Sequence, residues 1–408
     1  MADFHQGGVV TTLHRLGRTD LARLERELLS YADTRPIALV LPCLHSELRD
    51  VALKGIIETL QGVPYLRQVV VSVSGTDRRD QFDELRDAFS GVRTLTGEAP
   101  TLIWNGGPGL HRLYQRLRNE DLDPGDDGKG RSCWMAYGYV LATRVSRVVA
   151  LHDCDIRDYS RVLLARLCYP TANPRLDYEF AKGYYGRATD RLYGRVTRLF
   201  MTPLLKAMKS VLGPLPLLEF IDSFRYPLAG ECSMALDLAR INRVPSDWGL
   251  EVGMLAEVYR NCSLRRVCQV ELVDNYDHKH QELSEHDASR GLHRMVLDIA
   301  GSLFRHLASY GVEFSAGFLN TMTAAYVRIA QDAISSYGAD AALNGLAFER
   351  HEEEVALETF SRALRAAGLG FVRDPMGAPP IPNWNRVSSA LPDFLDELRE
   401  AVAEDAAA

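Results

Sequence analysis

The stretch that decides the fold is Arg-Val-Val-Ala-Leu-His-Asp-Cys-Asp at residues 147–155. Its four consecutive apolar residues, 148–151, predict a strand that is buried on both faces. Asp153 and Asp155 follow this strand, and in open α/β sheets ligands bind beyond the carboxyl ends of the strands. Since alternate side chains of an extended chain point the same way, both carboxylates could reach one divalent cation that holds a nucleotide diphosphate. The alternative is an Asp-x-Asp pair that merely caps a helix or turns the chain.

Similar apolar runs occur throughout the first half of the chain. Residues 37–41, 69–73 and 101–104 predict buried strands, and the first of them is expected to stop at Pro42. Each run is followed by a polar turn and a stretch with helical periodicity. Strands that alternate with helices in this order predict a parallel sheet with right-handed crossovers, as in nucleotide-binding α/β domains.

The composition of the 408 residues is that of an ordinary globular protein, with 46% hydrophobic and 25% charged residues. The net charge of −7 gives no electrostatic reason to expect nucleic acid or an anionic membrane as a partner. We expect no membrane span and a cytoplasmic location, because the N-terminus lacks a signal sequence and no apolar run is long enough. Seven cysteines without a Cys-x-x-Cys pair predict reduced thiols rather than disulfides or a zinc site.

A glycine-rich polar loop at residues 122–131 precedes a helix that is predicted to run from Ser132 to Val145. Backbone N–H groups of such a loop, together with the charge of Lys129, could bind phosphate. This loop does not have the pattern of a P-loop, because Gly130 stands where a Ser or Thr is required. A flexible surface loop is the alternative interpretation.

The local basic site that an anionic substrate would need lies later in the chain. It is formed by arginines near a predicted helix start, together with Thr197: Arg187, Arg191, Arg195 and Arg198. Guanidinium groups bind phosphate or carboxylate in a bidentate manner. A solvent-exposed helix face explains the same residues equally well.

Further candidate polar residues lie in loops. Glu231 and Asp247 could be structural anchors or acceptors for sugar hydroxyl groups. A predicted strand at residues 267–272 precedes His278 and His280, and a neutral imidazole is a competent ligand for a divalent ion. The identity of any histidine ligand stays open, because the two histidines are only one residue apart.

Several motifs in order carry a resemblance to a known family. They are Pro-x-Leu-x-x-Glu after the first strand, Gly-Lys-Gly before a helix, Asp-x-Asp after a strand, Gly-Arg-Val-Thr, Pro-Leu-Ala-Gly-Glu, Gly-x-Glu-x-Gly, and a histidine after Gln-Val-x-Leu. Over residues 35–283 the sequence resembles the glucosyl-3-phosphoglycerate synthases, a family of retaining glycosyltransferases with the GT-A fold.

The resemblance implies a Rossmann-like, mostly parallel sheet flanked by helices, in a catalytic domain at 1–285 with a helical C-terminal extension at 286–408. It implies an enzyme that moves glucose from a nucleotide-sugar donor, a UDP- or GDP-hexose, to 3-phospho-D-glycerate. It also implies Mg²⁺ or Mn²⁺ as cofactor, and a homodimer. The alternatives are transfer of mannose or glucose to D-glycerate, and a protein that binds sugar nucleotides without catalysis.

Roles of individual residues also follow from the resemblance. Asp155 and His278 would ligate the metal ion on the diphosphate, and Asp153 would contact the ribose or the sugar. The remaining donor-binding residues would hold the nucleotide: Pro42, Leu44, Glu47, Ser74 and Lys129.

The acceptor and the transferred sugar are assigned in the same way. Gly194, Arg195 and Thr197 would bind the phosphate of 3-phosphoglycerate. Leu228, through its backbone, and Glu251 would face the sugar, so that they form the catalytic group together with Asp155. The expected mechanism is transfer on one face of the sugar, with the metal stabilising the departing diphosphate and no protein nucleophile.

Two features depart from the pattern of the family. His45 stands where an Asn is usual, and His-Lys-His at 278–280 replaces His-Arg-Asn, which leaves room for unphosphorylated glycerate as acceptor. After residue 285 the periodicity predicts helices at 292–310, 318–337, 352–367 and 391–403. We expect this extension to pack on the catalytic domain and on a second subunit, and to hold no obvious chemistry.

Overall fold

The computed structural model of the chain describes residues 6–277, 282–377 and 379–407. Within these ranges the strands form one eight-stranded sheet in the order β1-β8-β6-β7-β5-β2-β3-β4. The strands are β1 (Thr11–Leu13), β2 (Ile37–Leu44), β3 (Leu66–Ser74), β4 (Thr101–Trp104), β5 (Val148–Leu151), β6 (Phe180–Gly186), β7 (Cys232–Ala235) and β8 (Val267–Asn275).

The predicted α/β fold is confirmed, and the sheet is mostly parallel. Only β7 runs antiparallel to its neighbours β5 and β6. Strand β5 is the predicted 148–151 run, and all four of its residues are buried. β7 was not predicted, because its four residues directly follow the Pro-Leu-Ala-Gly-Glu turn and are too few to show a period. β2 also continues through Pro42, which the sequence analysis took as its end.

Helices cover both faces of this sheet. The sheet helices are α1 (Leu21–Tyr31), α2 (Val51–Leu60), α3 (Arg79–Ala88), α4 (Pro108–Asn119), α5 (Lys129–Thr143), α6 (Arg161–Ala172) and α9 (Leu236–Ile241), with short turns η1 (His45–Arg49), η2 (Phe89–Gly91) and η4 (Leu264–Arg266). β2 shows how the sequence positions them: Ala38 and Val40 enter the core on one face, while Leu39 and Leu41 enter the core on the other. The alternation follows from the two-residue period of a strand.

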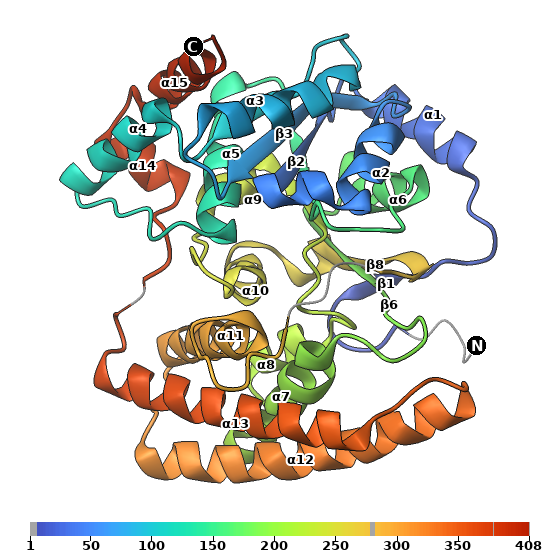
Figure 1. The fold of residues 1–408 in the computed structure, drawn as a ribbon, viewed down its shortest axis with the longest axis vertical. Coiled ribbons are helices and arrows are strands. Elements are labelled where there is room, and N and C mark those ends of the chain that lie inside the picture. The colour runs from blue at the N-terminus through green and yellow to red at the C-terminus, as the bar shows by residue number, and fades with distance from the viewer. Residues whose placement is uncertain (1–5, 278–281, 378, 408) are drawn as a thin grey trace.

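A second layer of helices lies beneath one side of the sheet (Figure 1). It contains α7 (Thr202–Leu212), α8 (Pro216–Asp222), α10 (Leu250–Asn261), α11 (Gly291–Ser309), α12 (Ala316–Leu343) and α13 (Arg350–Arg373), with the π-helical turn η3 (Val196–Met201). α12 packs on α7, so the extension and the segment before residue 285 share one core. A domain boundary near 285 therefore stays a prediction.

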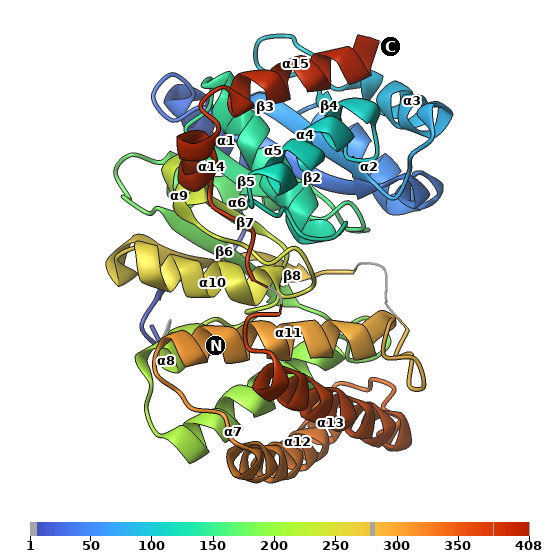
Figure 2. The same ribbon diagram turned by 90° about the vertical axis from the view of Figure 1, so that its left-hand side faces the viewer.

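The end of the chain returns to the sheet. α14 (Trp384–Ala390) and α15 (Phe394–Ala407) lie beside α4 and α5, far from α12 and α13 (Figures 1 and 2). Trp384 anchors this segment, because its ring is buried and stacks on Trp134 of α5 at 4.1 Å between centroids. Packing of the extension on the rest of the chain is confirmed. In the parts of the chain described here, no helix has the length and apolarity needed to cross a bilayer.

Candidate active site

A cavity of about 890 Å³ opens beyond the carboxyl ends of β2, β3 and β5 and reaches the helical layer. Cavities of this size hold ligands as large as a sugar nucleotide. The cavity brings together residues from distant parts of the chain. Every site residue that the family resemblance implies and that lies within the described ranges lines it: Pro42, Leu44, Glu47, Ser74, Lys129, Asp153, Asp155, Gly194, Arg195, Thr197, Leu228 and Glu251.

Lys129 lies between two carboxylates at one wall of this cavity. Its ammonium is 2.7 Å from Asp153 Oδ1 and 2.9 Å from Glu251 Oε1. Burial alone would lower the pKa of Lys129, but the two carboxylates outweigh it and hold the pKa well above its ordinary value. The lysine therefore stays charged and fixes Asp153 and Glu251 in one place. It is also the first residue of α5, which begins three residues before the predicted start at Ser132.

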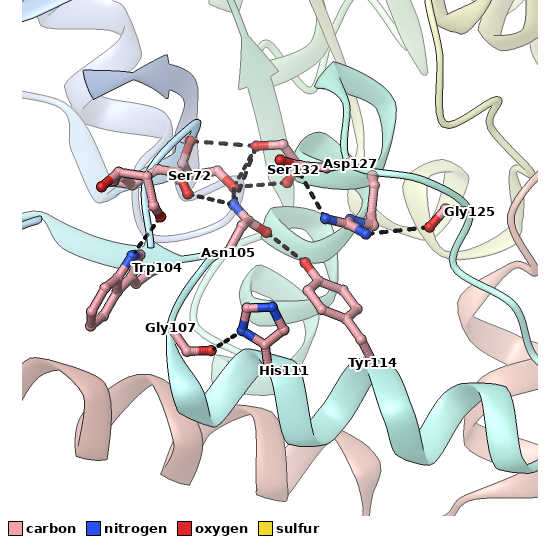
Figure 3. Close-up of polar contacts among 12 residues, drawn as sticks. Ser72, Trp104, Asn105, Gly107, His111, Tyr114, Gly125, Asp127 and Ser132 are labelled. Carbon is pink, nitrogen blue, oxygen red and sulfur yellow. Dashed lines mark hydrogen bonds and ion pairs between the residues drawn. The ribbon is translucent and has the colours of Figure 1, made fainter. Parts of the chain in front are cut away.

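A buried polar network holds the loop in front of α5 (Figure 3). The amide of Asn105, at the end of β4, donates to the Ser72 hydroxyl at 2.9 Å, and that hydroxyl donates to the Ser132 carbonyl at 2.9 Å. The Tyr114 hydroxyl donates to Asn105 Oδ1 at 2.6 Å. Arg131 donates to Asp127 and to the Gly125 carbonyl. The bonds of Ser72, Asn105 and Ser132 tie β3, β4 and α5 together, and Arg131 joins α5 to the glycine-rich loop.

The Asp-x-Asp motif places its two carboxylates in different surroundings. Asp153 pairs with Lys129, whereas Asp155 lines the cavity two residues further on. His152 lies buried beneath them: one ring nitrogen is 3.0 Å from the Asp153 carbonyl and the other is 2.8 Å from the Tyr159 hydroxyl. Burial lowers the pKa of His152 to about 4. A neutral imidazole thus supports the loop that carries both acids.

The predicted metal site is only partly within the described residues. His278 and His280 lie outside them, so their relation to Asp155 stays a prediction. Among the described residues, no three His, Cys, Asp or Glu side chains are grouped as a metal site requires. Asp155 does offer the oxygen ligand that Mg²⁺ and Mn²⁺ prefer, on the wall of the cavity.

The four arginines do not act as one group. Arg187, Arg191 and Arg195 line the cavity. Arg198 does not: its guanidinium donates to the Tyr193 carbonyl at 2.8 Å and to Glu353 at 3.0 Å, and its side chain is only 10% exposed. The prediction that all four arginines form one anion site is therefore wrong for Arg198. This residue lies one helical turn after Gly194 and faces the helical layer.

The sequence leaves two possible roles for Glu231 and Asp247, as structural anchors or as hydrogen-bond acceptors for sugar hydroxyl groups. Glu231 accepts hydrogen bonds from the hydroxyls of Tyr185 and Tyr276, and burial raises its pKa. Asp247 Oδ1 accepts from the Gly249 backbone N–H at 2.8 Å. Both acids have structural partners, which favours the anchor interpretation.

Comparison with known proteins identifies the family. No family model matches the sequence. The chain is 45% identical to the glucosyl-3-phosphoglycerate synthase of Persephonella marina, over 99% of both chains. It is 38% identical to the enzyme of that name from Methanococcoides burtonii, over 99% of this chain and 98% of the relative.

This chain belongs to the glucosyl-3-phosphoglycerate synthase family.

The family relationship extends over the helical extension, well beyond the residues 35–283 that carry the motifs. The fold agrees with a solved structure as well. A crystal structure of the Mycobacterium tuberculosis glucosyl-3-phosphoglycerate synthase with Mn²⁺, UDP and phosphoglyceric acid is 22% identical, with a TM-score of 0.52. The match covers 74% of this chain and 87% of that one, and at this identity it supports the GT-A fold alone.

The helical extension adds charged side chains to the site. α11 and α13 contribute Arg294, Asp298 and Glu352 to the lining of the cavity, and the sequence alone provides no expectation of charged residues from the extension there. Arg294 donates to Asp298 at 2.9 Å, but burial dominates and raises the pKa of Asp298 to about 6. No motif marks these residues. Asp298 alone has a sequence signal, because it is a charged residue within the apolar stripe of α11.

Proposed function

We propose that this chain transfers glucose from a nucleotide-sugar donor to 3-phospho-D-glycerate, with retention at the anomeric carbon, to give glucosyl-3-phosphoglycerate. One observation carries the proposal: a single cavity is lined by the residues predicted to bind the donor, the acceptor and the sugar, although they lie far apart in the sequence. Membership in the family over the full length supports it. So does the content of the M. tuberculosis structure, which holds Mn²⁺, UDP and phosphoglyceric acid.

The nucleotide would bind at the carboxyl ends of β2 and β3. Pro42 and Leu44 belong to β2, Ser74 ends β3, and Glu47 is buried in the turn η1. Lys129 at the start of α5 would face the diphosphate, where the helix N-terminus also favours an anion.

The cation would be held by Asp155 and His278. Bound there, Mg²⁺ or Mn²⁺ would neutralise charge on the diphosphate as it leaves. The carboxylate of Asp155 on the cavity wall fits a hard divalent ion. Asp153, which Lys129 holds by its ammonium, would contact the ribose or the sugar.

The acceptor would approach the sugar on the same face that the diphosphate leaves, as retention without a protein nucleophile requires. Gly194, Arg195 and Thr197, at the start of η3, would bind its phosphate. Leu228 and Glu251 would contact the sugar itself. The carboxylates of Asp153 and Glu251 both pair with Lys129, which favours positioning and charge stabilisation over attack by a protein nucleophile.

We also infer a cytoplasmic location and a homodimer. All seven cysteines are buried free thiols, which suits a reducing compartment. Light scattering in solution should give a mass near twice the 45.6 kDa of one chain. A mass of one chain at working concentration would contradict the dimer.

The test is a coupled assay of nucleoside diphosphate release, with mass spectrometry of the product. The donors compared are UDP-glucose, GDP-glucose and the corresponding mannose donors. Each is offered with 3-phosphoglycerate or with D-glycerate, and in the presence of Mg²⁺, Mn²⁺ or EDTA. We expect release and a glucosyl-3-phosphoglycerate product only with 3-phosphoglycerate and a metal. Faster transfer to D-glycerate would assign the other acceptor. Nucleotide binding without any transfer would contradict catalysis.

A further inference from the structure

Two consecutive carboxylates of the extension reach the predicted acceptor site. Glu352 and Glu353 lie in the first turn of α13, and both accept hydrogen bonds from Arg195. Nε of Arg195 donates to Glu353 at 2.8 Å, and Nη2 donates to Glu352 at 2.7 Å. One edge of the guanidinium is therefore occupied by α13, and Nη1 takes part in neither bond.

Glu353 is fixed from its other side. Its side chain is 5% exposed, and its second oxygen accepts from Arg198 at 3.0 Å. Arg198 is itself held by the backbone carbonyls of Tyr193 and Leu192, and its guanidinium lies over the ring of Tyr337 at 4.9 Å. Glu353 thus joins Arg195 to a rigid part of the fold. A carboxylate suits this position, because its two oxygens accept from two guanidinium groups and its negative charge is opposite to theirs.

Glu352 is held far less firmly. Its side chain is 51% exposed, and it lines the cavity beside Arg195. Exposed ion pairs of this kind are weak, and solvent or a competing anion can replace one partner. A phosphate that approached Arg195 from the cavity would compete with Glu352 for the same N–H groups, whereas Glu353 would stay behind the guanidinium.

We propose that Glu353 is a positioning residue that aims Arg195 at the acceptor phosphate, and that Glu352 is an exchangeable counter-ion which this phosphate displaces. The proposal rests on the proposed function, since it takes Arg195 as a phosphate ligand. It deepens that function by adding selectivity. An acceptor must carry enough negative charge to replace a carboxylate, and a phosphate dianion meets this condition better than the single carboxylate of free glycerate.

Two isosteric variants test the pair, Glu352→Gln and Glu353→Gln, with Glu354→Gln as the matched control. Glu354 is the next residue of α13, but it pairs with Arg350 at 3.5 Å and is absent from the cavity lining. Glu353→Gln should raise the acceptor KM about tenfold or more, with the donor KM unchanged. Glu352→Gln should lower the acceptor KM, and the inhibition constant of inorganic phosphate, about two- to fivefold. Glu354→Gln should change neither constant.

Glu353 is buried, so each variant is first compared with the wild type by thermal unfolding. If Glu353→Gln does not fold, Glu353→Asp keeps the charge but shortens the side chain, and it should likewise raise the acceptor KM. The proposal is overturned if the folded Glu353 variant has the acceptor KM of the control. It is equally overturned if Glu352→Gln leaves the acceptor KM unchanged or raises it.

Arg195→Ala separates this proposal from the proposed function. If Arg195→Ala leaves the acceptor KM unchanged, the phosphate does not bind at Arg195, and the acceptor assignment itself fails. If Arg195→Ala raises the acceptor KM while the Glu353 variant does not, only the positioning role is wrong.

Discussion

In the motif of Asp153 and Asp155, the first carboxylate is bound by a partly buried lysine. Lys129 pairs with both Asp153 and Glu251, so Asp153 belongs to a network of three charged side chains. Asp155 lines the cavity two residues further on. The two acids should therefore respond differently to substitution, and only Asp155 should control the dependence on a divalent ion.

Asp155→Ala should lower kcat by about two to three orders of magnitude, the loss typical of removing one group that stabilises charge in the transition state. The midpoint of thermal unfolding should change little, because the side chain faces the cavity. The comparison variant is Asp158→Ala, an exposed acid in the same loop that is absent from the cavity lining. An Asp155→Ala enzyme with wild-type turnover and metal dependence would refute the metal assignment.

At the scale of single elements, α11 combines a structural and a site role. It lines the cavity through Arg294 and Asp298 and packs against α10 near its other end. There His306 lies against α10, and burial, together with Arg305 and Arg243, lowers its pKa to about 4. The imidazole is therefore neutral in the folded protein.

His306 should make the protein less stable in acid. The ordinary pKa of histidine is near 6.5, so between pH 6.5 and 4 the unfolded chain binds more protons than the folded chain. Its contribution is complete above pH 6.5 and is lost as the pH falls towards 4, by roughly 3 kcal/mol over the window. His306→Gln should flatten this part of the stability profile in urea titrations at several pH values. His111→Gln, which replaces an exposed histidine, is the control. If stability depends on pH in the same way in both variants, the role of His306 is contradicted.

α14 is the element that fastens the end of the chain to the sheet. Trp384 is fully buried, stacks on Trp134 and donates from its indole to the Trp134 carbonyl at 3.2 Å. Gly138 makes room for the ring, because a Cβ there would lie 2.1 Å from it.

Trp384→Ala should cost about 3–5 kcal/mol of unfolding free energy, as large aromatic deletions in a core do. Urea denaturation followed by circular dichroism measures the loss, and Arg386→Ala, an exposed position on the same helix, is the control. A loss of under about 1 kcal/mol would mean that α14 is not held by this stack.

At the scale of the whole molecule, the cavity lies between the sheet and the helical layer. Its walls come from β2, β3 and the loop after β5 on one side, and from η3, α11 and α13 on the other. A ligand that fills it should hold both layers together, since binding to the folded state alone stabilises that state.

UDP-glucose with Mg²⁺ at a hundred times its dissociation constant should add about 2.7 kcal/mol and raise the midpoint of thermal unfolding by a few degrees. EDTA should remove most of this gain, because the diphosphate would lose its counter-ion. UMP, which lacks the diphosphate, is the control and should show little dependence on Mg²⁺. Equal stabilisation by UDP-glucose with Mg²⁺ and with EDTA would contradict a metal site in the cavity.

Short apolar runs in the sequence correctly predicted some of the strands. The runs at 101–104 and 148–151 gave strands at those residues, because short buried strands are continuous apolar segments bounded by polar turns. β7 and the continuation of β2 through Pro42 escaped prediction. Both depend on neighbouring strands that are distant in sequence, and a proline is tolerated where its neighbours do not need its N–H.

By itself, the sequence determined the α/β class, the family and the residues that line the cavity. Each of these follows from short sequence motifs that occur in a fixed order. Only the tertiary structure decided which partner each charge has. Lys129 holds two acids, Arg198 turns away from the cavity, and Glu353 reaches Arg195 across 158 positions of sequence. Ion pairs between distant segments leave no periodicity along the chain, so they become visible only once packing brings the segments together.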